Sequence, residues 1–123
     1  MHIVPDGKAD ALPIIEFDQF MAVDIRVGRV IAAEALKDAR KPAYILTIDF
    51  GGAIGVKKSC AQITEHYQIE KLPGRLVAAV VNFAPRQVGK VMSQVLTLGF
   101  PDASGAVVLF EPDHEVPIGS RLF

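Results

Sequence analysis

The sequence predicts an all-β protein whose core is a five-stranded antiparallel barrel, with short helices and extra segments at both ends. Hydrophobic and polar residues alternate with a period of two in several short stretches between residues 25 and 98, as in half-buried strands. Glycine- and proline-containing turns separate these stretches. The chain has 123 residues, half of them hydrophobic, which suits one domain with one core.

The N-terminal part of the chain divides into an extension and the start of the domain. Residues 1–16 read as an irregular extension, and residues 17–123 as the domain. A short helix is expected over 17–23, where Phe17, Phe20 and Met21 form an apolar side. Asp18 is the expected N-cap, because its carboxylate can accept hydrogen bonds from the free amides of the first turn.

The first three strands are expected over 25–31, 44–50 and 53–60. Gly28 interrupts the alternation of the first strand, which predicts a bulge or a tight coil there. Residues 34–42 form a polar connection to the second strand. One face of that strand carries Tyr44, Leu46, Ile48 and Phe50, and a two-glycine turn at 51–52 leads into the third strand.

The second half of the chain continues the barrel. A short helix is expected over 61–67, followed by a strand over 75–82 that is apolar enough to be covered on both faces. A fifth strand is expected over 93–98, an extra strand over 106–110 and a last edge over 121–123. Five strands with a helix between the third and fourth match the order of an OB barrel, in which the loops after strands one and four flank the binding face. Here those loops are 34–42 and 83–92, and both carry cations.

Charge is unevenly distributed, although the net charge is only −1. Residues 25–100 hold eleven cations and five acids, a net charge of +6, whereas residues 1–24 and 101–123 together hold two cations and nine acids, a net charge of −7. A basic body is compatible with an anionic partner on one face. The acidic ends can equally cover the basic body of the same subunit or of a second one.

The motifs of several function classes are missing. His2, His66 and His114 lie in no metal-binding spacing, and no phosphate loop or nucleophile elbow is present. We therefore expect no enzyme activity, no metal and no cofactor. The single Cys60 reads as a small buried hydrophobe, or as a reactive thiol activated by nearby cations. No signal peptide or membrane span is visible, so a cytoplasmic protein is expected.

Four short segments resemble one known family. They are 24–28 (DIRVG), 59–63 (SCAQI), 82–86 (NFAPR) and 93–99 (SQVLTLG). In their order and spacing they look like the tRNA-binding-domain family of OB folds, and the resemblance runs from about residue 17 to residue 123. That family includes a free tRNA-binding protein and the C-terminal appendix of some methionyl-tRNA synthetases.

The chain departs from the general pattern of that family at two places. Family members typically read Asn-Leu-Lys-Pro in the fourth loop, whereas this chain has Asn82-Phe83-Ala84-Pro85. They read Ser-x-Gly-Met at the start of strand five, whereas this chain has SQVL at 93–96. At both places the chain instead resembles one branch of the family, the small bacterial export-related chaperones. The lost lysine also removes a phosphate contact, which weakens the case for tRNA as the chief ligand.

The first functional hypothesis follows from that branch. It implies a non-enzymatic homodimer that binds unfolded precursor polypeptides and assists their export. The expected peptide-binding residues are Phe83, Arg86, Val88, Lys90 and Met92. The alternative is that these side chains fill a dimer interface or the barrel mouth. The resemblance places the dimer interface in the segments 12–20 and 107–123, with Ile14, Ile15, Phe17, Phe20, Leu109 and Phe110 as its apolar residues.

The second hypothesis is structure-specific tRNA binding. Its candidate residues are Arg26, Arg40, Lys41, Lys57, Asn82, Arg86, Lys90 and Ser93. The cations would meet phosphates, and Asn82 and Ser93 would lie nearer the bases or riboses. The alternative for each cation is an ordinary solvated surface residue.

Overall fold

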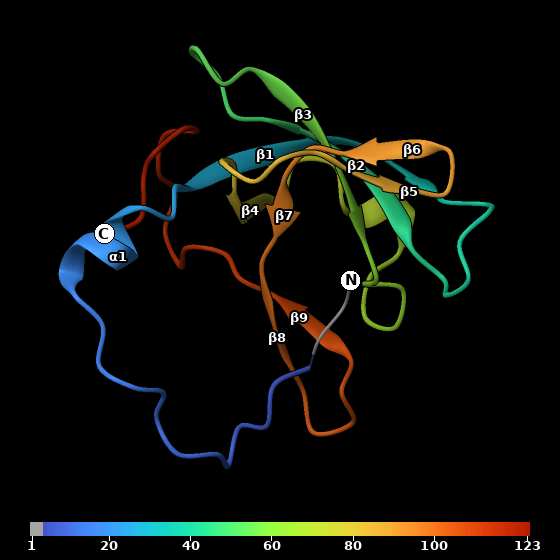
Figure 1. The fold of residues 1–123 in the computed structure, drawn as a ribbon. Coiled ribbons are helices and arrows are strands. Elements are labelled where there is room, and N and C mark those ends of the chain that lie inside the picture. The colour runs from blue at the N-terminus through green and yellow to red at the C-terminus, as the bar shows by residue number, and fades with distance from the viewer. Residues whose placement is uncertain (1–3) are drawn as a thin grey trace.

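The computed structural model describes residues 4–123 and is built around one nearly closed antiparallel barrel (Figure 1). Its main sheet has the strand order β3-β2-β1-β4-β7. The strands are β1 (Ile25–Ala35), β2 (Tyr44–Asp49), β3 (Val56–Ala61), β4 (Leu76–Val80) and β7 (Leu96–Thr97). The predicted all-β, OB-type barrel is therefore confirmed.

The core lies inside this barrel. Leu46, Ile48 and Phe50 are almost fully buried, so the predicted inner face of β2 is confirmed. All five residues of β4 are buried, as its continuous apolar run predicted. The turn between β2 and β3 is longer than two glycines, because the N–H of Phe50 bonds the carbonyl of Gly55 at 3.0 Å.

The irregularity of β1 does not lie where the sequence predicted it. The register with β2 shifts between Val30 and Ala32, so Ile31 is the extra residue and not Gly28. Gly28 is required for packing instead. A Cβ there would lie 2.4 Å from Cγ2 of Ile48 and 2.8 Å from the Phe50 ring.

Both helix predictions need correction. The helix α1 (Phe17–Met21) is present, but it is two residues shorter and its N-cap is Glu16, whose N–H bonds the Gln19 side chain at 2.7 Å. The helix predicted over 61–67 is wrong. A turn and the short 3₁₀ helix η1 (Ile69–Lys71) take its place. Ile63, just after β3, packs into the barrel core, and the turn over residues 64–66 follows it.

The segment after β4 contains more strand than predicted. A small ribbon of β5 (Arg86–Val88) and β6 (Val91–Ser93) forms within the expected loop 83–92 and extends one residue past it. A second ribbon pairs β8 (Gly99–Pro101) with β9 (Val107–Leu109). The predicted last edge is one bridge between Arg121 and Arg26. Leu109, an expected interface residue, is buried in the barrel core instead.

The N-terminal segment lies outside the barrel. Residues 4–16 run in a wide arc below the barrel to α1, and every one of them is exposed (Figure 1). Within the described residues, no helix has the length and apolar character needed to cross a membrane. Among residues 4–123, no group of His, Cys, Asp or Glu is arranged to hold a metal ion.

Candidate functional site

A cleft of about 880 Å³ lies where the loop after β1 meets the segment after β4. Residues 38–41 and Ala43 form one wall, and Phe83, Ala84, Arg86, Val88 and Gly89 form another. Residues 60–63 at and after the end of β3, residues 93–97 and Val107 complete the lining. The two loops that the barrel order predicted to flank one face therefore lie at the same cleft.

A second apolar cluster fixes the two walls relative to each other. Leu36, Ala43 and Ile45 are its buried members. Ala39, Cys60, Val88 and Val91 are half-buried and pack against it. The β5–β6 ribbon is thus held against the outer side of the barrel by apolar contacts, and this position exposes its β5 side to the cleft.

Hydrogen bonds between β3 and residues 93–94 close the barrel beside the cleft. The N–H of Cys60 donates to Oγ of Ser93 at 3.0 Å. The N–H of Lys58 donates to Oε1 of Gln94 at 2.9 Å, and the N–H of Gln94 donates to the carbonyl of Lys58 at 2.8 Å. Ser93 therefore lines the cleft with its hydroxyl already used in a structural bond.

Three of the five candidate peptide-binding residues line the cleft. Phe83 and Arg86 are exposed there, and Val88 is half-buried because it also packs on the second apolar cluster. Lys90 lies beyond the lining, 3.9 Å from the carboxylate of Asp38. Met92 is exposed on the β5–β6 ribbon opposite Gln87, outside the cleft lining.

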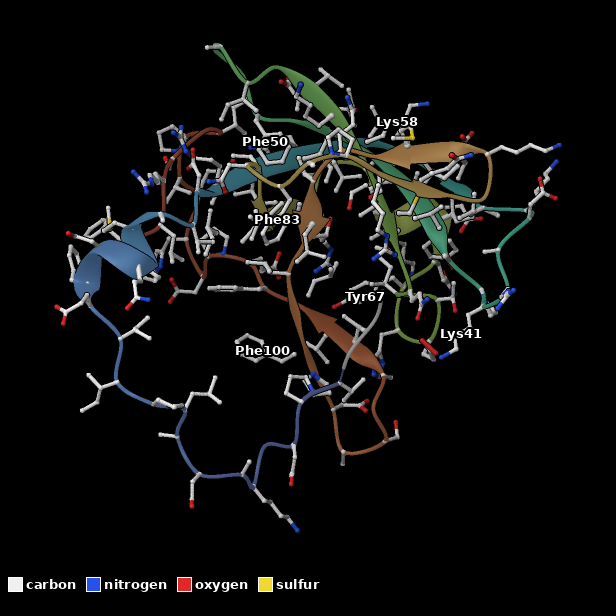
Figure 2. The ribbon with its side chains drawn as sticks, in the orientation of Figure 1. Lys41, Phe50, Lys58, Tyr67, Phe83 and Phe100 are labelled. Carbon is white, nitrogen blue, oxygen red and sulfur yellow. The ribbon has the colours of Figure 1, made fainter. Side chains whose placement is uncertain are left out.

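The candidate RNA-binding residues divide into two groups. Arg40, Lys41, Arg86 and Ser93 line the cleft, and Lys41 and Phe83, from opposite walls, are labelled in Figure 2. Arg26 is held elsewhere by Asp24 at 2.6 Å and by the carbonyl of Gly119 at 3.1 Å.

Asn82 and Lys57 also lie apart from the cleft lining. The Asn82 side chain accepts from the N–H of Asp24 at 2.9 Å and donates to the carbonyl of Ala22 at 2.8 Å. Asn82 thus joins the end of β4 to the segment between α1 and β1. Lys57 lies on β3, opposite Ile48.

Among residues 4–123, five of the ten lysines and arginines outside the cleft lining form ion pairs with carboxylates, whereas the cations that line the cleft form none. The ion pairs among residues 4–123 involve Arg26, Arg29, His66, Arg75, Lys90, His114 and Arg121. Arg40, Lys41 and Arg86 take part in none of these pairs. Within the described chain, the cleft therefore has positive charge that no carboxylate neutralises directly.

Cys60 lines the cleft but is not activated. Burial raises the pKa of its thiol, and this effect outweighs the lowering by the Ser93 hydroxyl and by Lys58. A thiol with a raised pKa is largely protonated at neutral pH and is a weak nucleophile. The reactive-thiol alternative is therefore not favoured.

Some lining residues were not among the candidates from the sequence. Asp38, Gln62, Ile63 and Leu96 all belong to the cleft. Leu96 is partly exposed, and the alternation within 93–98 could have placed it on the outer face. No sequence pattern could have placed the end of β3 at the cleft, because its position opposite residues 93–97 depends on closure of the barrel.

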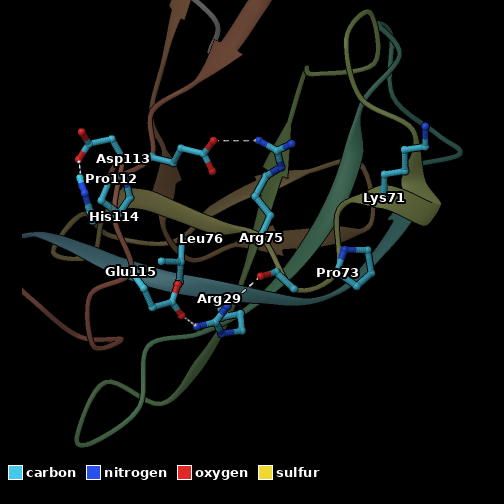
Figure 3. Close-up of a pocket in the computed structure, with 11 residues that line it drawn as sticks. Arg29, Lys71, Pro73, Arg75, Leu76, Pro112, Asp113, His114 and Glu115 are labelled. Carbon is cyan, nitrogen blue, oxygen red and sulfur yellow. Dashed lines mark hydrogen bonds and ion pairs between the residues drawn. The ribbon is translucent and has the colours of Figure 1, made fainter.

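A second hollow, of about 760 Å³, lies between β1, the η1–β4 turn and residues 111–115 (Figure 3). Arg29 pairs with Glu115 there, and Arg75 lies 3.3 Å from Glu111. The acidic C-terminal segment thus covers part of the basic body of its own subunit. The charge distribution had left open whether the acidic ends cover the same subunit or a second one. Because both arginines already have carboxylate partners, this hollow is a weaker candidate for ligand binding.

Comparison with known proteins identifies the family. A family model described as a putative tRNA binding domain matches residues 25–121. The chain belongs to this tRNA-binding-domain family. It is 38% identical over 112 residues to methionine–tRNA ligase of Methanothrix thermoacetophila, covering 91% of this chain but only 16% of that ligase. The chain thus spans about a sixth of the curated relatives that it matches.

Within the family, the chain is close to the CsaA chaperones. The crystal structure of chaperone CsaA from Bacillus anthracis strain Ames superposes with a TM-score of 0.84 and 44% identity, over 90% of this chain and all of that one. CsaA from Picrophilus torridus superposes with a TM-score of 0.82 and 42% identity, over 89% of this chain and all of that one.

Proposed function

We propose that this protein is a non-enzymatic, CsaA-type chaperone of the cytoplasm that binds unfolded precursor polypeptides and assists their export. The cleft between the β1–β2 loop and the β5–β6 ribbon carries this proposal. It combines exposed apolar side chains with polar and cationic ones, and a polypeptide segment offers both kinds of group. The similarity to two chaperones over their whole length supports it.

The proposed peptide contacts are Phe83, Arg86, Val88, Lys90 and Met92. Phe83 is 54% exposed and can cover an apolar side chain of the client. Arg86 can bond backbone carbonyls or acidic side chains, and Val88 extends the apolar wall. Lys90 and Met92 lie farther along the ribbon, where they would meet a longer segment. Met adapts its shape to varied partners at low cost.

A binding assay with an unfolded client tests this function. We expect the protein to bind a reduced, permanently unfolded precursor and to delay its aggregation, while it ignores the same precursor in its folded state. Phe83→Ser should weaken this binding without unfolding the barrel, because Phe83 lies on the surface. Val56→Ser, which removes an apolar side chain of similar exposure from β3 outside the cleft lining, is the matched control. Equal binding of folded and unfolded precursor would contradict the proposal.

We infer further that the protein acts as a homodimer, with its N- and C-terminal segments at the interface. Leu12, Ile14 and Phe17 are 88%, 99% and 70% exposed, on a segment that extends away from its own barrel. Phe100 and Val108 are also exposed and lie opposite each other on the β8–β9 ribbon. A specific dimer would bury on the order of 800 Å² per subunit, and these residues offer such a surface.

The second candidate function is structure-specific tRNA binding, favoured by the family match and by the unpaired cations at the cleft. Arg40, Lys41, Arg86 and Lys90 would contact phosphates, with Ser93 beside them and Lys57 on β3. Arg26 and Asn82 would first have to give up their internal partners.

A salt titration with folded tRNA tests this second function. If several phosphates are contacted, log affinity should fall linearly with log salt, with a slope of several units. Arg40→Gln should reduce that slope by about one unit. A flat response to salt, or no measurable binding, would exclude tRNA as a ligand of this cleft.

A further inference from the structure

We propose that the cleft selects extended polypeptide segments whose apolar residues are flanked by acidic side chains, and that Arg40, Lys41 and Arg86 recognise these acids. This inference rests on the proposed peptide-binding function and specifies its substrate class.

The balance of charge around the cleft supports this selectivity. Among its described lining residues, Arg40, Lys41 and Arg86 are cations and Asp38 is the one carboxylate. Asp38 is partly compensated by Lys90, whose Nζ lies 3.9 Å from it. The local field is therefore positive, although the whole chain has a net charge of −1.

Apolar side chains lie among these cations. Phe83 and Leu96 line the cleft with 54% and 45% of their surfaces exposed, and Val88 adds a half-buried neighbour. A client segment could place an apolar side chain on Phe83 or Leu96 and an acidic neighbour beside Arg86. A segment with basic flanks would place like charges together, which costs binding energy.

The second hollow, between Arg29 and Glu115, cannot discriminate in this way. Arg29 and Arg75 both face carboxylates of the C-terminal segment there, so the charges are balanced within the chain. The selectivity belongs to the cleft because its cations have no such partners among residues 4–123.

This selectivity determines which part of a precursor the cleft binds. Secretory signal peptides begin with a positively charged region. The cleft would repel that region and would engage a segment elsewhere in the precursor, where acidic and apolar residues are neighbours.

A peptide series with one variable tests the inference. Three fluorescent peptides share the same apolar core and differ only in their flanking residues, which are Asp, Ser or Lys. We expect the Asp-flanked peptide to bind about tenfold more tightly than the Ser-flanked one, as two or three exposed charge pairs would give, and the Lys-flanked peptide to bind weakest. High ionic strength should reduce these differences, because salt screens exposed charges.

Single substitutions of the cleft cations test whether the preference for acidic flanks originates in the cleft. Lys41→Gln and Arg86→Gln should each reduce the preference for Asp over Ser flanks by about twofold to fivefold. Lys71→Gln, which removes an exposed cation from η1 outside the cleft, should leave the preference unchanged. Protection of Cys60, the sole cysteine, from alkylation by the bound peptide would place the peptide in the cleft.

The outcomes separate this inference from the function on which it rests. If none of the peptides binds and no unfolded precursor binds, the chaperone function and the inference both fail. If all three bind equally, or the Lys-flanked peptide binds best, the inference is overturned while peptide binding stands. If the preference persists in both cleft variants, the selective surface lies elsewhere and the inference is also overturned.

Discussion

Gly28 shows how one residue is fixed by packing rather than by backbone shape. Its Cα lies so close to β2 that an added Cβ would meet Ile48 at 2.4 Å and Phe50 at 2.8 Å. Both neighbours are almost fully buried, so neither can move freely. The sequence marked Gly28 as unusual, but its cause, contact with the opposite strand, could be seen only in the folded barrel.

We predict that Gly28→Ala lowers the free energy of unfolding by about 1–3 kcal/mol, because it overpacks the core. Urea denaturation followed by far-UV circular dichroism measures this change. Gly7→Ala is the control, since a Cβ there would meet nothing within 4 Å. If the urea midpoint of Gly28→Ala equals that of the wild type, β1 and β2 can move apart at little cost in free energy.

Asn82 was expected to contact RNA, yet its side chain makes two internal hydrogen bonds. We predict that Asn82→Ala lowers the free energy of unfolding by about 1–2 kcal/mol, because two hydrogen bonds of the α1–β1 junction are lost. Gln87→Ala, which loses only a local bond to Gly89, is the control. Reduced tRNA binding at unchanged stability would restore the RNA role of Asn82.

At the scale of elements, the β8–β9 ribbon is tied to the connection after β3 by a His66–Asp102 contact and by a hydrogen bond from the N–H of Leu109 to the Tyr67 hydroxyl at 2.8 Å. His66 Nε2 lies 2.6 Å from Oδ2 of Asp102. Asp102 also accepts hydrogen bonds from Ser104 and from the N–H of Ala106. The His66 contact first, and then the bonds from Ser104, hold the pKa of Asp102 well below its usual range.

This lowered pKa predicts how stability depends on pH. A carboxyl whose pKa is lower in the folded state contributes stability above its unfolded pKa of about 4 and loses that contribution as the pH falls further. Asp102→Asn should therefore be less stable than the wild type at pH 7, and the difference should shrink below about pH 4. Urea midpoints across this range measure it.

Asp10→Asn is the control for the Asp102 prediction, because Asp10 is an exposed carboxylate of the N-terminal segment. It should not alter the stability of the barrel at either pH. A constant difference between wild type and Asp102→Asn at all pH values would show that the ion pair with His66 does not stabilise the ribbon.

The β5–β6 ribbon shows what sequence patterns miss at this scale. A polar loop with Pro85 and Gly89 was expected over residues 83–92, and two three-residue strands form there instead. Each is too short for a clear alternation. Contacts of Val88 and Val91 with the second apolar cluster hold the ribbon in place, and these partners are distant in sequence.

At the scale of the whole molecule, the exposed apolar residues of the N-terminal segment favour association of two copies. Ile14 and Phe17 are two of the most exposed apolar residues and lie at the end of the N-terminal segment. We predict that the wild type is a dimer by light scattering at micromolar concentration, and that Ile14→Ser together with Phe17→Ser shifts it to monomer. The thermal midpoint of the barrel itself should change little, because neither residue packs in its core.

Val4→Ser is the matched control for the dimer prediction, since it removes an exposed apolar residue from the far end of the same segment. A wild-type protein that scatters as a monomer would contradict the homodimer. A double variant that remains fully dimeric would place the interface elsewhere on the surface, for example on the β8–β9 ribbon.

The sequence by itself determined the barrel, the order of its strands and the two loops that carry cations. Apolar periodicity depends on local spacing, so β2 and β4 could be recognised without knowledge of their partners. The family motifs then pointed to the same fold. These features are local, and their physical cause is the alternation of side chains across a strand.

Only the tertiary structure decided which cations remain unpaired. Arg26 and Arg86 look alike in the sequence, yet Arg26 is held by Asp24 and Gly119 whereas Arg86 lines the cleft. Likewise, Asn82 and Ser93 form structural hydrogen bonds with residues 58 and 33 positions away. Whether a polar side chain is available to a ligand depends on contacts between distant segments, and only the closed barrel brings those segments together.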